Sequence, residues 1–232
     1  MTTNSVMQTR GKSPAESVLV VGGGPAGLMA AIAAATAGAR TAVLERMPMP
    51  GAKLVATGGG RCNLTNALSA GEFLERFGKG GKFIRPAIER LDSTALRSFF
   101  QSLGVNTRCT DGFHYFPVSE SAAEVRDALL KRCNALGVEM FFEEDAFGLI
   151  LHENSVRGVE TSQGRLDATR IVLAAGGCAW PTLGSNGSGF TIAQAAGHTI
   201  ISPCPALVPL VTRQDWPRTC TGIVIPDARI RI

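Results

Sequence analysis

The N-terminal part of the chain carries a strand–helix–strand pattern of hydrophobic positions. Val18–Val21 is a short, continuous apolar run, which is typical of a strand buried on both faces. Apolar residues from Leu28 to Ala35 then recur at the i, i+4, i+7 spacing of a helix that packs on a sheet, and Gly38 is placed to end that helix. A second apolar run, Thr41–Leu44, follows. The pattern predicts a parallel β-α-β unit.

The middle of the chain is predicted to hold helices and a hairpin. Helical segments are expected within Phe83–Leu103, with Pro86 near one helix start and Gly104 at the stop. Thr107–Val118 is typical of a hairpin that turns at Asp111-Gly112.

A further helix is predicted to open with a capping box at Ser121–Glu124 and to end at Gly137. In a capping box, the first and last residues of such a segment exchange hydrogen bonds between side chain and backbone. The residues expected to face inward are Val125, Leu129, Cys133 and Leu136.

Short β-like runs follow, with turn signals at Glu153-Asn154 and Gln163-Gly164. An apolar run leads directly into Gly176-Gly177, and a helix is expected at about Phe190–Ala196. The predicted strands are 138–142, 147–152, 156–160, 165–169 and 171–175. Together these elements predict an α/β fold, a Rossmann-like domain with a β-meander.

The domain boundaries are predicted from changes in composition. Met1–Glu16 is polar and is expected to be a flexible tail, followed by a Rossmann-like domain over 17–204. Prolines cluster between Ser202 and Pro209, so 205–232 is expected to begin a β-rich insertion domain. Gly222–Ile232 alternates like a strand up to the last residue, which favours a polypeptide cut within that domain over a terminal edge strand.

Composition narrows the class of protein. The 232 residues are 45% hydrophobic and 18% charged, and the small net charge of +4 has no strongly clustered basic patch, so a nucleic-acid partner is not expected. Six cysteines without a C-x-x-C pair, together with three histidines, give no zinc spacing. No signal peptide or membrane-spanning run is recognised, so we expect a cytoplasmic protein with reduced thiols, no metal and no membrane partner.

A G-x-G-x-x-G motif lies between the first strand and the first helix, at Gly22, Gly24 and Gly27. The first glycine allows a tight turn, the second allows a pyrophosphate to approach, and the third allows the helix to pack closely on the sheet. Pro25 suits the first helical turn, and free N–H groups there, such as that of Ala26, suit phosphate.

Glu45 ends the second strand, where a carboxylate accepts hydrogen bonds from ribose hydroxyls. This favours FAD or NAD over NADP, although Arg46 beside it leaves NADP open. The competing interpretation is an ordinary β-α-β turn without a ligand.

Two more glycine-rich loops are candidates for ligand contact. In Thr57–Asn66, three glycines expose backbone N–H groups and Arg61 adds donors suited to phosphate. Asn63 and Thr65 are able to hydrogen-bond a polar ring edge, whereas Cys62 is interpreted as a small buried residue. The loop that begins at Gly176 follows a buried strand, so its glycines are expected to line the same crevice as Gly24.

These motifs together resemble the BaiN/YhiN-like FAD-binding flavoproteins, which include aminoacetone-oxidase-like members. The resemblance rests on Gly22–Gly27 with Glu45, on Gly51–Asn66, and on several later segments. Those segments are Gly112–Pro117, Leu173–Gly177, Pro181–Gly189, Gly197-His198 and Pro205–Pro209. His114 and Ser188 depart from the arginine and aspartate usual in the family.

The resemblance implies a glutathione-reductase type of FAD domain, interrupted by an insertion and completed by a returning C-terminal stretch. It implies FAD as cofactor and admits NAD(P)H as electron donor. The residues predicted to contact the cofactor are Gly22, Gly24, Pro25, Ala26, Gly27, Glu45, Arg46, Lys53, Gly59, Gly60, Arg61, Cys62, Asn63, Ala146, Ala175, Gly176 and Gly177.

The sequence therefore predicts an FAD-dependent oxidoreductase that transfers a hydride or electrons to or from a small-molecule substrate. Two alternatives stay open: an NAD-dependent dehydrogenase, and a nucleotide-binding fragment without catalysis. No Ser-His-Asp set or paired carboxylates appear, so no catalytic acid or base is assigned. His114 and His198 are interpreted as structural or surface histidines.

Overall fold

The computed structural model describes residues 16–153, 155–205, 213–220 and 223. Contacts divide the chain into two units, one ending at Ile200 and one beginning at Ile201, and each is considered by itself. The first unit holds nearly all of the described structure. In the second, α8 (Trp216–Thr219) is the helix within the described residues. The predicted tail over 1–15, Asn154 and the alternating run over 224–232 lie outside the described residues.

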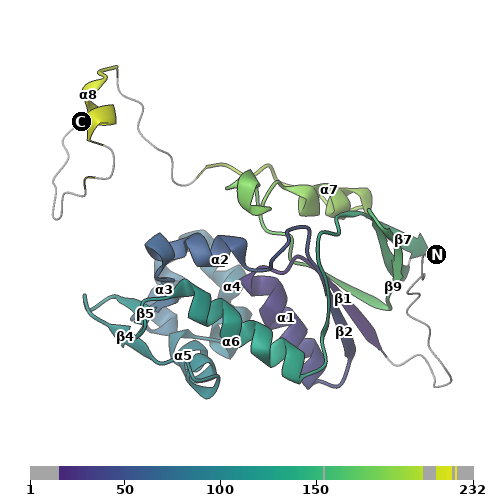
Figure 1. Ribbon diagram of the computed structural model, residues 1–232, viewed down its shortest axis with the longest axis horizontal. Helices are drawn as coiled ribbons and strands as arrows, with labels where there is room; N and C mark the ends of the chain where they lie inside the picture. The colour runs from purple at the N-terminus through teal and green to yellow at the C-terminus, as the bar shows by residue number, and fades with distance from the viewer. Residues whose placement is uncertain (1–15, 154, 206–212, 221–222, 224–232) are drawn as a thin grey trace. The chain divides into compact units, whose positions relative to one another are not determined.

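A four-stranded parallel sheet forms the centre of the first unit, in the order β10-β1-β2-β6 (Figure 1). Its strands are β1 (Ser17–Val21), β2 (Arg40–Leu44), β6 (Glu139–Phe141) and β10 (Arg170–Leu173). The first strand in sequence lies between β2 and the last strand of the sheet, and all four end on the same side. Ligands of such sheets collect beyond these carboxyl ends.

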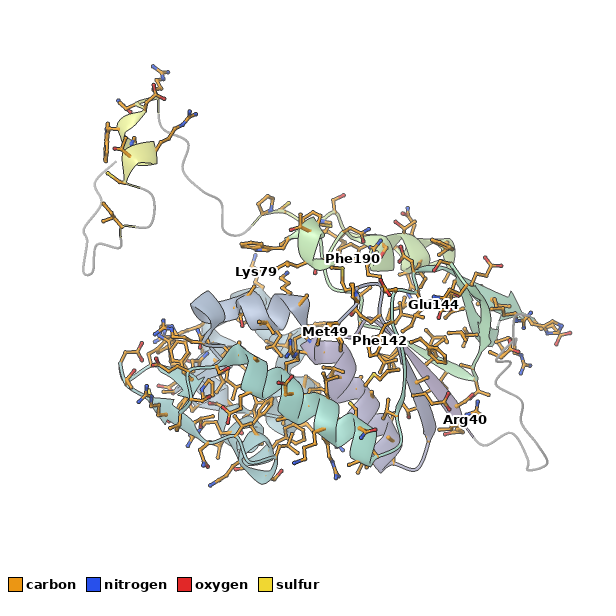
Figure 2. All side chains as sticks on the ribbon, viewed as in Figure 1. Arg40, Met49, Lys79, Phe142, Glu144 and Phe190 are labelled. Atoms are coloured by element: carbon orange, nitrogen blue, oxygen red, sulfur yellow. The ribbon has the colours of Figure 1, made fainter. Side chains whose placement is uncertain are left out.

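Two helices cover one face of the sheet: α1 (Pro25–Thr36) and α6 (Ala122–Ala135) (Figure 1; Figure 2 adds the side chains in the same view). Val18 and Val20 of β1 face this side and pack in one buried cluster with Leu28 and Leu129. Because successive strand residues point to opposite faces, Leu19 and Val21 belong to a second cluster on the other side. The continuous apolar run therefore reflects a sheet covered on both faces.

A three-stranded antiparallel meander contributes to the second cluster. Its strands are β7 (Ala146–His152), β8 (Ser155–Thr161) and β9 (Gly164–Asp167). Val159 of β8 is fully buried and packs with Ile192 of α7 (Ser188–Ala195). The predicted Rossmann-like domain with a β-meander is confirmed.

A small subdomain of helices and a hairpin lies between β2 and α6 in sequence. Its antiparallel sheet has the order β3-β5-β4, with β3 (Thr65–Asn66), β4 (Thr107–Cys109) and β5 (His114–Pro117). The remaining helical elements are α2 (Ala52–Ala56), η1 (Thr57–Gly60), α3 (Ala70–Arg76), η2 (Gly78–Gly80), α4 (Gly81–Arg90) and α5 (Ser93–Ser102), and η3 (Pro181–Leu183) follows β10. The hairpin turn at Asp111-Gly112 is confirmed, because Asp111 accepts the N–H groups of Phe113 and His114.

Two sequence predictions about helix starts are wrong. Pro86 lies inside α4 and not near its start, because α4 begins at Gly81. A Cβ at Gly81 would lie 2.4 Å from the Leu74 carbonyl oxygen, so close packing on α3 determines where the helix begins. The capping box predicted at Ser121 does not form, since the Ser121 side chain makes no cap hydrogen bond.

Ser119 replaces Ser121 at that helix start: its hydroxyl contacts the Glu124 carboxylate and accepts the Ser121 N–H. A complete capping box occurs instead at Ser69 and Glu72, at the start of α3. Val125, Leu129 and Cys133 are buried as predicted, whereas Leu136 at the end of the helix is only partly buried. Within the described part of the chain, no helix combines the length and apolar character needed to cross a bilayer.

Candidate functional site

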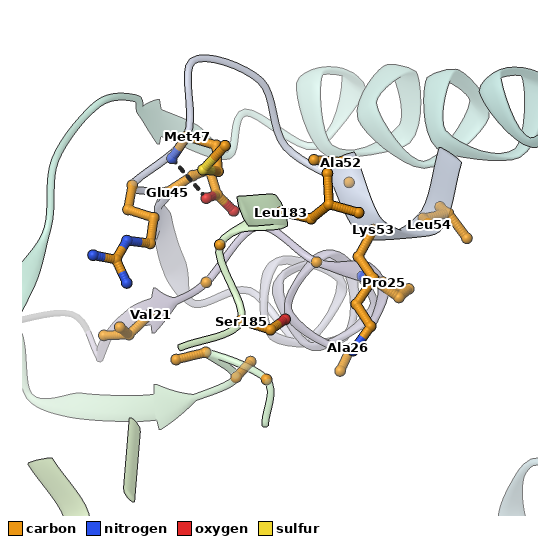
Figure 3. Close-up of a pocket in the computed structure, with 18 of the residues that line it drawn as sticks. Val21, Pro25, Ala26, Glu45, Met47, Ala52, Lys53, Leu54, Leu183 and Ser185 are labelled. Carbon is orange, nitrogen blue, oxygen red and sulfur yellow. Dashed lines mark hydrogen bonds between the residues drawn. The ribbon is translucent and has the colours of Figure 1, made fainter. Parts of the chain in front are cut away.

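A cavity of about 330 Å³ lies at the carboxyl ends of β1, β2 and β10, in the first unit (Figure 3). Its wall includes the start of α1, the end of β2, helix α2 and the loop after β10. This volume is at the lower end of the range of ligand pockets, roughly 300–1,000 Å³. The position is where an open α/β sheet binds nucleotides.

The three motif glycines meet different surroundings. A Cβ at Gly22 would lie 2.5 Å from the Ala174 carbonyl oxygen of the neighbouring strand's end, and a Cβ at Gly27 would lie 1.8 Å from the Gly22 carbonyl oxygen. Packing within the protein therefore requires both glycines. A Cβ at Gly24 would meet no atom of the described part of the chain within 4 Å, and Gly24 lines the cavity. The middle glycine thus leaves open space that a ligand is able to occupy.

The N-terminus of α1 opens onto the cavity, and no side chain of the described residues caps it. Gly24 is the N-cap, its position makes no side-chain cap hydrogen bond, and the first turn has no acidic residue. The Leu28 N–H donates to the Gly24 carbonyl at 2.9 Å, so the N–H groups of Ala26 and Gly27 precede the first helical bond. These donors and the positive end of the helix dipole favour an anion such as a pyrophosphate.

Glu45 is 8% exposed and joins the end of β2 to the glycine turn. One carboxylate oxygen accepts the Gly23 N–H at 2.8 Å. The other accepts the Met47 N–H at 2.8 Å, the bond drawn in Figure 3. Each oxygen of a carboxylate has capacity for a second hydrogen bond. Glu45 therefore remains competent to accept ribose hydroxyls while it is fixed by two backbone donors.

Arg46 extends this side of the cavity through an ion pair. Its Nη2 lies 2.6 Å from Oδ2 of Asp145, a residue just before β7, and both side chains are about 30% exposed and line the cavity (29% and 32%). Its Nη1 is buried and has no hydrogen-bond partner among the described residues. Such a donor fits a cavity that takes up a polar ligand, because buried donors are otherwise satisfied within the protein.

The loop after β10 is tied to the opposite wall. The Lys53 ammonium donates to the Ala179 carbonyl at 3.2 Å. Gly176 and Gly184 line the cavity with positive φ angles of 77° and 92°. A Cβ at Gly184 would lie 3.1 Å from Cγ of Met47, so glycine allows the loop to approach the end of β2 closely.

Comparison with known proteins agrees with this arrangement. Residues 16–227 match the family described as the HI0933-like protein Rossmann domain. The chain belongs to this family. The predicted resemblance to the BaiN/YhiN-like flavoproteins is thereby confirmed.

Two curated relatives of this HI0933-like chain have names that state different activities. The 3-dehydro-bile acid delta(4,6)-reductase of Clostridium scindens is 36% identical over 91% of the chain and 51% of the relative. The ribosomal RNA dihydrouridine synthase of Haemophilus influenzae is 25% identical over 90% of the chain and 52% of the relative. The chain thus spans about half the length of the curated relatives it matches.

Among solved structures, a flavocytochrome c3 fumarate reductase in its open conformation has a similar fold. The TM-score is 0.65 at 22% identity, and the match covers 82% of this chain and 42% of that one. At this identity the likeness shows that the HI0933-like Rossmann domain shares a fold with that protein.

The predicted cofactor residues of the HI0933-like domain fall into two groups. Those that line the cavity are Gly22, Gly24, Pro25, Ala26, Glu45, Arg46, Lys53, Ala146, Ala175 and Gly176. Those outside its lining are Gly27, Gly59, Gly60, Arg61, Cys62, Asn63 and Gly177. Gly27 supports the turn from behind, and Cys62 is the small buried residue that was predicted, with a thiol whose pKa is raised by burial.

The two histidines near motifs also follow the prediction that they are structural or surface residues. His198 is exposed, and Nδ1 of His114 lies 2.6 Å from the Asp111 carboxylate on the hairpin. This contact and two backbone donors hold the pKa of Asp111 well below its usual range.

Several cavity residues were not found from the sequence. The most informative are Met47, Thr57, Asp145, Leu183 and Ser185. Asp145 directly precedes the predicted contact Ala146, and Ser185 lies within the segment that suggested the family, so adjacency to a motif was the available signal. Leu183 lies in the same family segment as Ser185, and Thr57 begins the glycine-rich loop predicted to contact a ligand. Met47 carries no chemical signal in sequence, because its role depends on apolar shape.

Proposed function

We propose that this chain is the FAD-binding part of a flavin-dependent oxidoreductase. The observation that supports this most is the open space at Gly24, which faces the uncapped start of α1 while Glu45 stands beside it. Family membership and the shared fold support the same proposal. FAD binding is proposed for the domain described here. The oxidoreductase activity is proposed for a whole protein of the relatives' kind, because the relative from Clostridium scindens is about twice as long as the part that this chain matches.

The residues present fit the proposed cofactor. The N–H groups of Ala26 and Gly27 would hold the pyrophosphate, and Glu45 would accept the ribose hydroxyls. Arg46, which lines the cavity beside Glu45, would add positive charge near the ribose end of the nucleotide. Bound FAD would supply hydride or electron transfer, and these residues bind and orient it.

The reaction partners are proposed by class. We propose a small-molecule substrate, NAD(P)H as the electron donor, and a cytoplasmic location that suits six free cysteines. The names of the relatives specify a bile acid in one case and ribosomal RNA in the other. A small molecule is the better fit here, because the chain carries a net charge of only +4 and no strong basic cluster.

The first experiment identifies the nucleotide. Purified chain is denatured, and the released compounds are separated and identified by their absorbance spectra; FAD is expected. Refilling the stripped protein with FAD and, separately, with NAD⁺ should give binding of FAD alone. Preferential binding of NAD⁺ would support the dehydrogenase instead, and binding of neither would contradict the proposal.

A matched pair of variants tests the site itself. Gly24→Val places a branched side chain in the open space of the cavity, whereas Gly71→Val places one in equally open space at the start of α3. We expect Gly24→Val to abolish FAD retention after gel filtration and Gly71→Val to retain it. Equal retention in both variants would show that the nucleotide binds elsewhere.

A further inference from the structure

The glycine-rich loop Thr57–Asn66, in which Gly59–Asn63 lie outside the cavity lining, folds back on itself. Gly58, Gly59 and Gly60 have φ angles of 57°, 66° and 86°, and the Cys62 N–H donates to the Thr57 carbonyl at 3.1 Å. Cys62 is buried at the base of this turn, whereas Arg61 is exposed. Thr57 lines the cavity, and Arg61 directly precedes Cys62, so this hydrogen bond brings the backbone of Arg61 close to the part of the cavity that Thr57 lines.

Arg61 is held over an aromatic ring of the hairpin. Its guanidinium carbon lies 4.7 Å from the centre of the Phe116 ring, and its Nε donates to the Gly58 carbonyl at 3.2 Å. The His114 ring lies 6.3 Å from Phe116, and Arg108 is the cross-strand neighbour of Phe116. We call Arg61, Arg108, His114 and Phe116 the Arg61 face.

Charge on the Arg61 face is compensated at every group but one. Arg108 pairs with Glu120 at 2.8 Å, and His114 pairs with Asp111 at 2.6 Å. Arg61 makes no ion pair within the described residues, and the residue is exposed. The face therefore presents a single uncompensated cation beside an aromatic ring. A nucleic acid would need several unpaired cations, since its affinity comes from many phosphate contacts.

The position of this face relative to the cavity suggests what approaches it. Figure 3 shows Glu45 on one side of the cavity and Leu54 on the other, with the start of α1 between them. A nucleotide with its ribose at Glu45 and its pyrophosphate at α1 would continue toward Leu54 and Thr57. A Cβ at Gly58, the neighbour of Thr57, would lie 3.4 Å from Cε1 of the Phe116 ring, so the Arg61 face is next to this end of the cavity.

We infer that Arg61, supported by Phe116, binds the carboxylate of an apolar organic acid that is the substrate. This inference rests on the proposed function and names the substrate class. The planar guanidinium matches a carboxylate with two parallel hydrogen bonds, and the Phe116 ring offers apolar surface for the body of the acid. Arg61 acts as a substrate-binding residue and takes no part in proton transfer.

The test uses calorimetric titration of the chain with 3-phenylpropionate and with its neutral analogue 3-phenylpropan-1-ol. The acid should bind about tenfold or more tightly than the alcohol, since hydrogen bonds between charged groups are worth more than neutral ones. Arg61→Gln should abolish this preference. Arg76→Gln is the matched control, because Arg76 also lies over a ring, that of Phe113 at 5.8 Å. It should leave the preference unchanged.

Flavin absorbance and circular dichroism are recorded for each variant. Equal binding of acid and alcohol, or an unchanged preference in a folded Arg61→Gln, would overturn the inference. Parallel loss of FAD and of the acid in Arg61→Gln would assign Arg61 to the cofactor and would also overturn it. A chain that binds the acid through Arg61 but never binds FAD would contradict the proposed function alone.

Discussion

The Glu45 carboxylate accepts the backbone N–H of Gly23 at 2.8 Å, so the residue that we propose for the ribose also braces the glycine turn. A Cβ at Gly23 would lie 2.9 Å from this same carboxylate oxygen, which shows how closely the two segments approach. The ends of β1 and β2 are therefore joined by a side chain as well as by the sheet. Effects on ligand binding and on stability are expected to be coupled at this residue.

Glu45→Ala should weaken FAD binding by about 1.5–3 kcal/mol, the range for hydrogen bonds to charged groups. It should also lower the free energy of unfolding by about 1–3 kcal/mol, because the buried N–H of Gly23 and the partly buried N–H of Met47 lose their acceptor. Titration of the stripped protein with FAD and urea unfolding measure the two effects. The exposed Glu75 supplies the control variant Glu75→Ala, which should change neither. Unchanged FAD affinity in Glu45→Ala would mean that the carboxylate has only the bracing role.

Alanine at the second and third motif glycines should affect different properties. Gly27→Ala should greatly reduce stability or prevent folding, because its Cβ would overlap the Gly22 carbonyl oxygen at 1.8 Å. Gly24→Ala should lower the unfolding free energy by no more than about 1 kcal/mol, because alanine is a poorer N-cap than glycine but meets no packing clash here. Its extended φ of −71° suits any residue. Thermal unfolding of the ligand-free variants measures the contrast, and similar melting temperatures would contradict the packing role of Gly27.

Replacing Ser69 should reduce stability more than replacing Ser121, although the sequence predicted the capping box at Ser121. Ser69→Ala should lower the unfolding free energy by about 1 kcal/mol, the usual value for an N-cap residue. It breaks a box in which Ser69 accepts the Glu72 N–H and Glu72 accepts the Ser69 N–H. Ser121→Ala should cost less, since that side chain caps nothing. Urea unfolding measures the unfolding free energy of both variants. A larger decrease in Ser121→Ala than in Ser69→Ala would contradict the prediction.

The thiols should react with a disulfide reagent at very different rates. Burial raises the pKa of the Cys133 thiol to about 11, and it also raises the pKa of Cys62. At pH 8 the thiolate fraction of Cys133 is on the order of one in a thousand, and the thiolate is the reactive form. Cys178 and Cys204 are exposed and should be labelled first. Peptide mapping after timed labelling gives the order; early labelling of Cys133 would contradict its burial.

Local patterns in the sequence were sufficient for the strand–helix–strand unit, the hairpin and the meander. Each of these depends on the spacing of residues that are close in the chain, such as the helical recurrence between Leu28 and Ala35. The start of α4 was not predictable in this way, because it depends on how closely Gly81 packs on Leu74. Pro86 was therefore assigned to a start that the chain does not use.

The candidate site was predictable to the extent that it follows the glycine motif. Gly22, Gly24 and Glu45 come together because β1 and β2 pair in parallel register. The pairing of Arg46 with Asp145 joins residues 99 positions apart, and no local pattern specifies it. Arg61 was placed with the phosphate ligands from its chemistry, but the turn at Gly58–Gly60 carries it outside the cavity lining.

The order of strands in the central sheet has a consequence for folding during synthesis on the ribosome. β1 pairs with β2 along one edge. Its other edge pairs with β10, which is about 150 residues later in the chain; Val20, for example, is the register partner of Val172. Until β10 emerges during synthesis, β1 presents an unpaired apolar edge of the kind that promotes aggregation. The cavity wall from Ala174 to Gly176 directly follows β10. The cavity is therefore complete for nucleotide binding only after β10 has paired with β1.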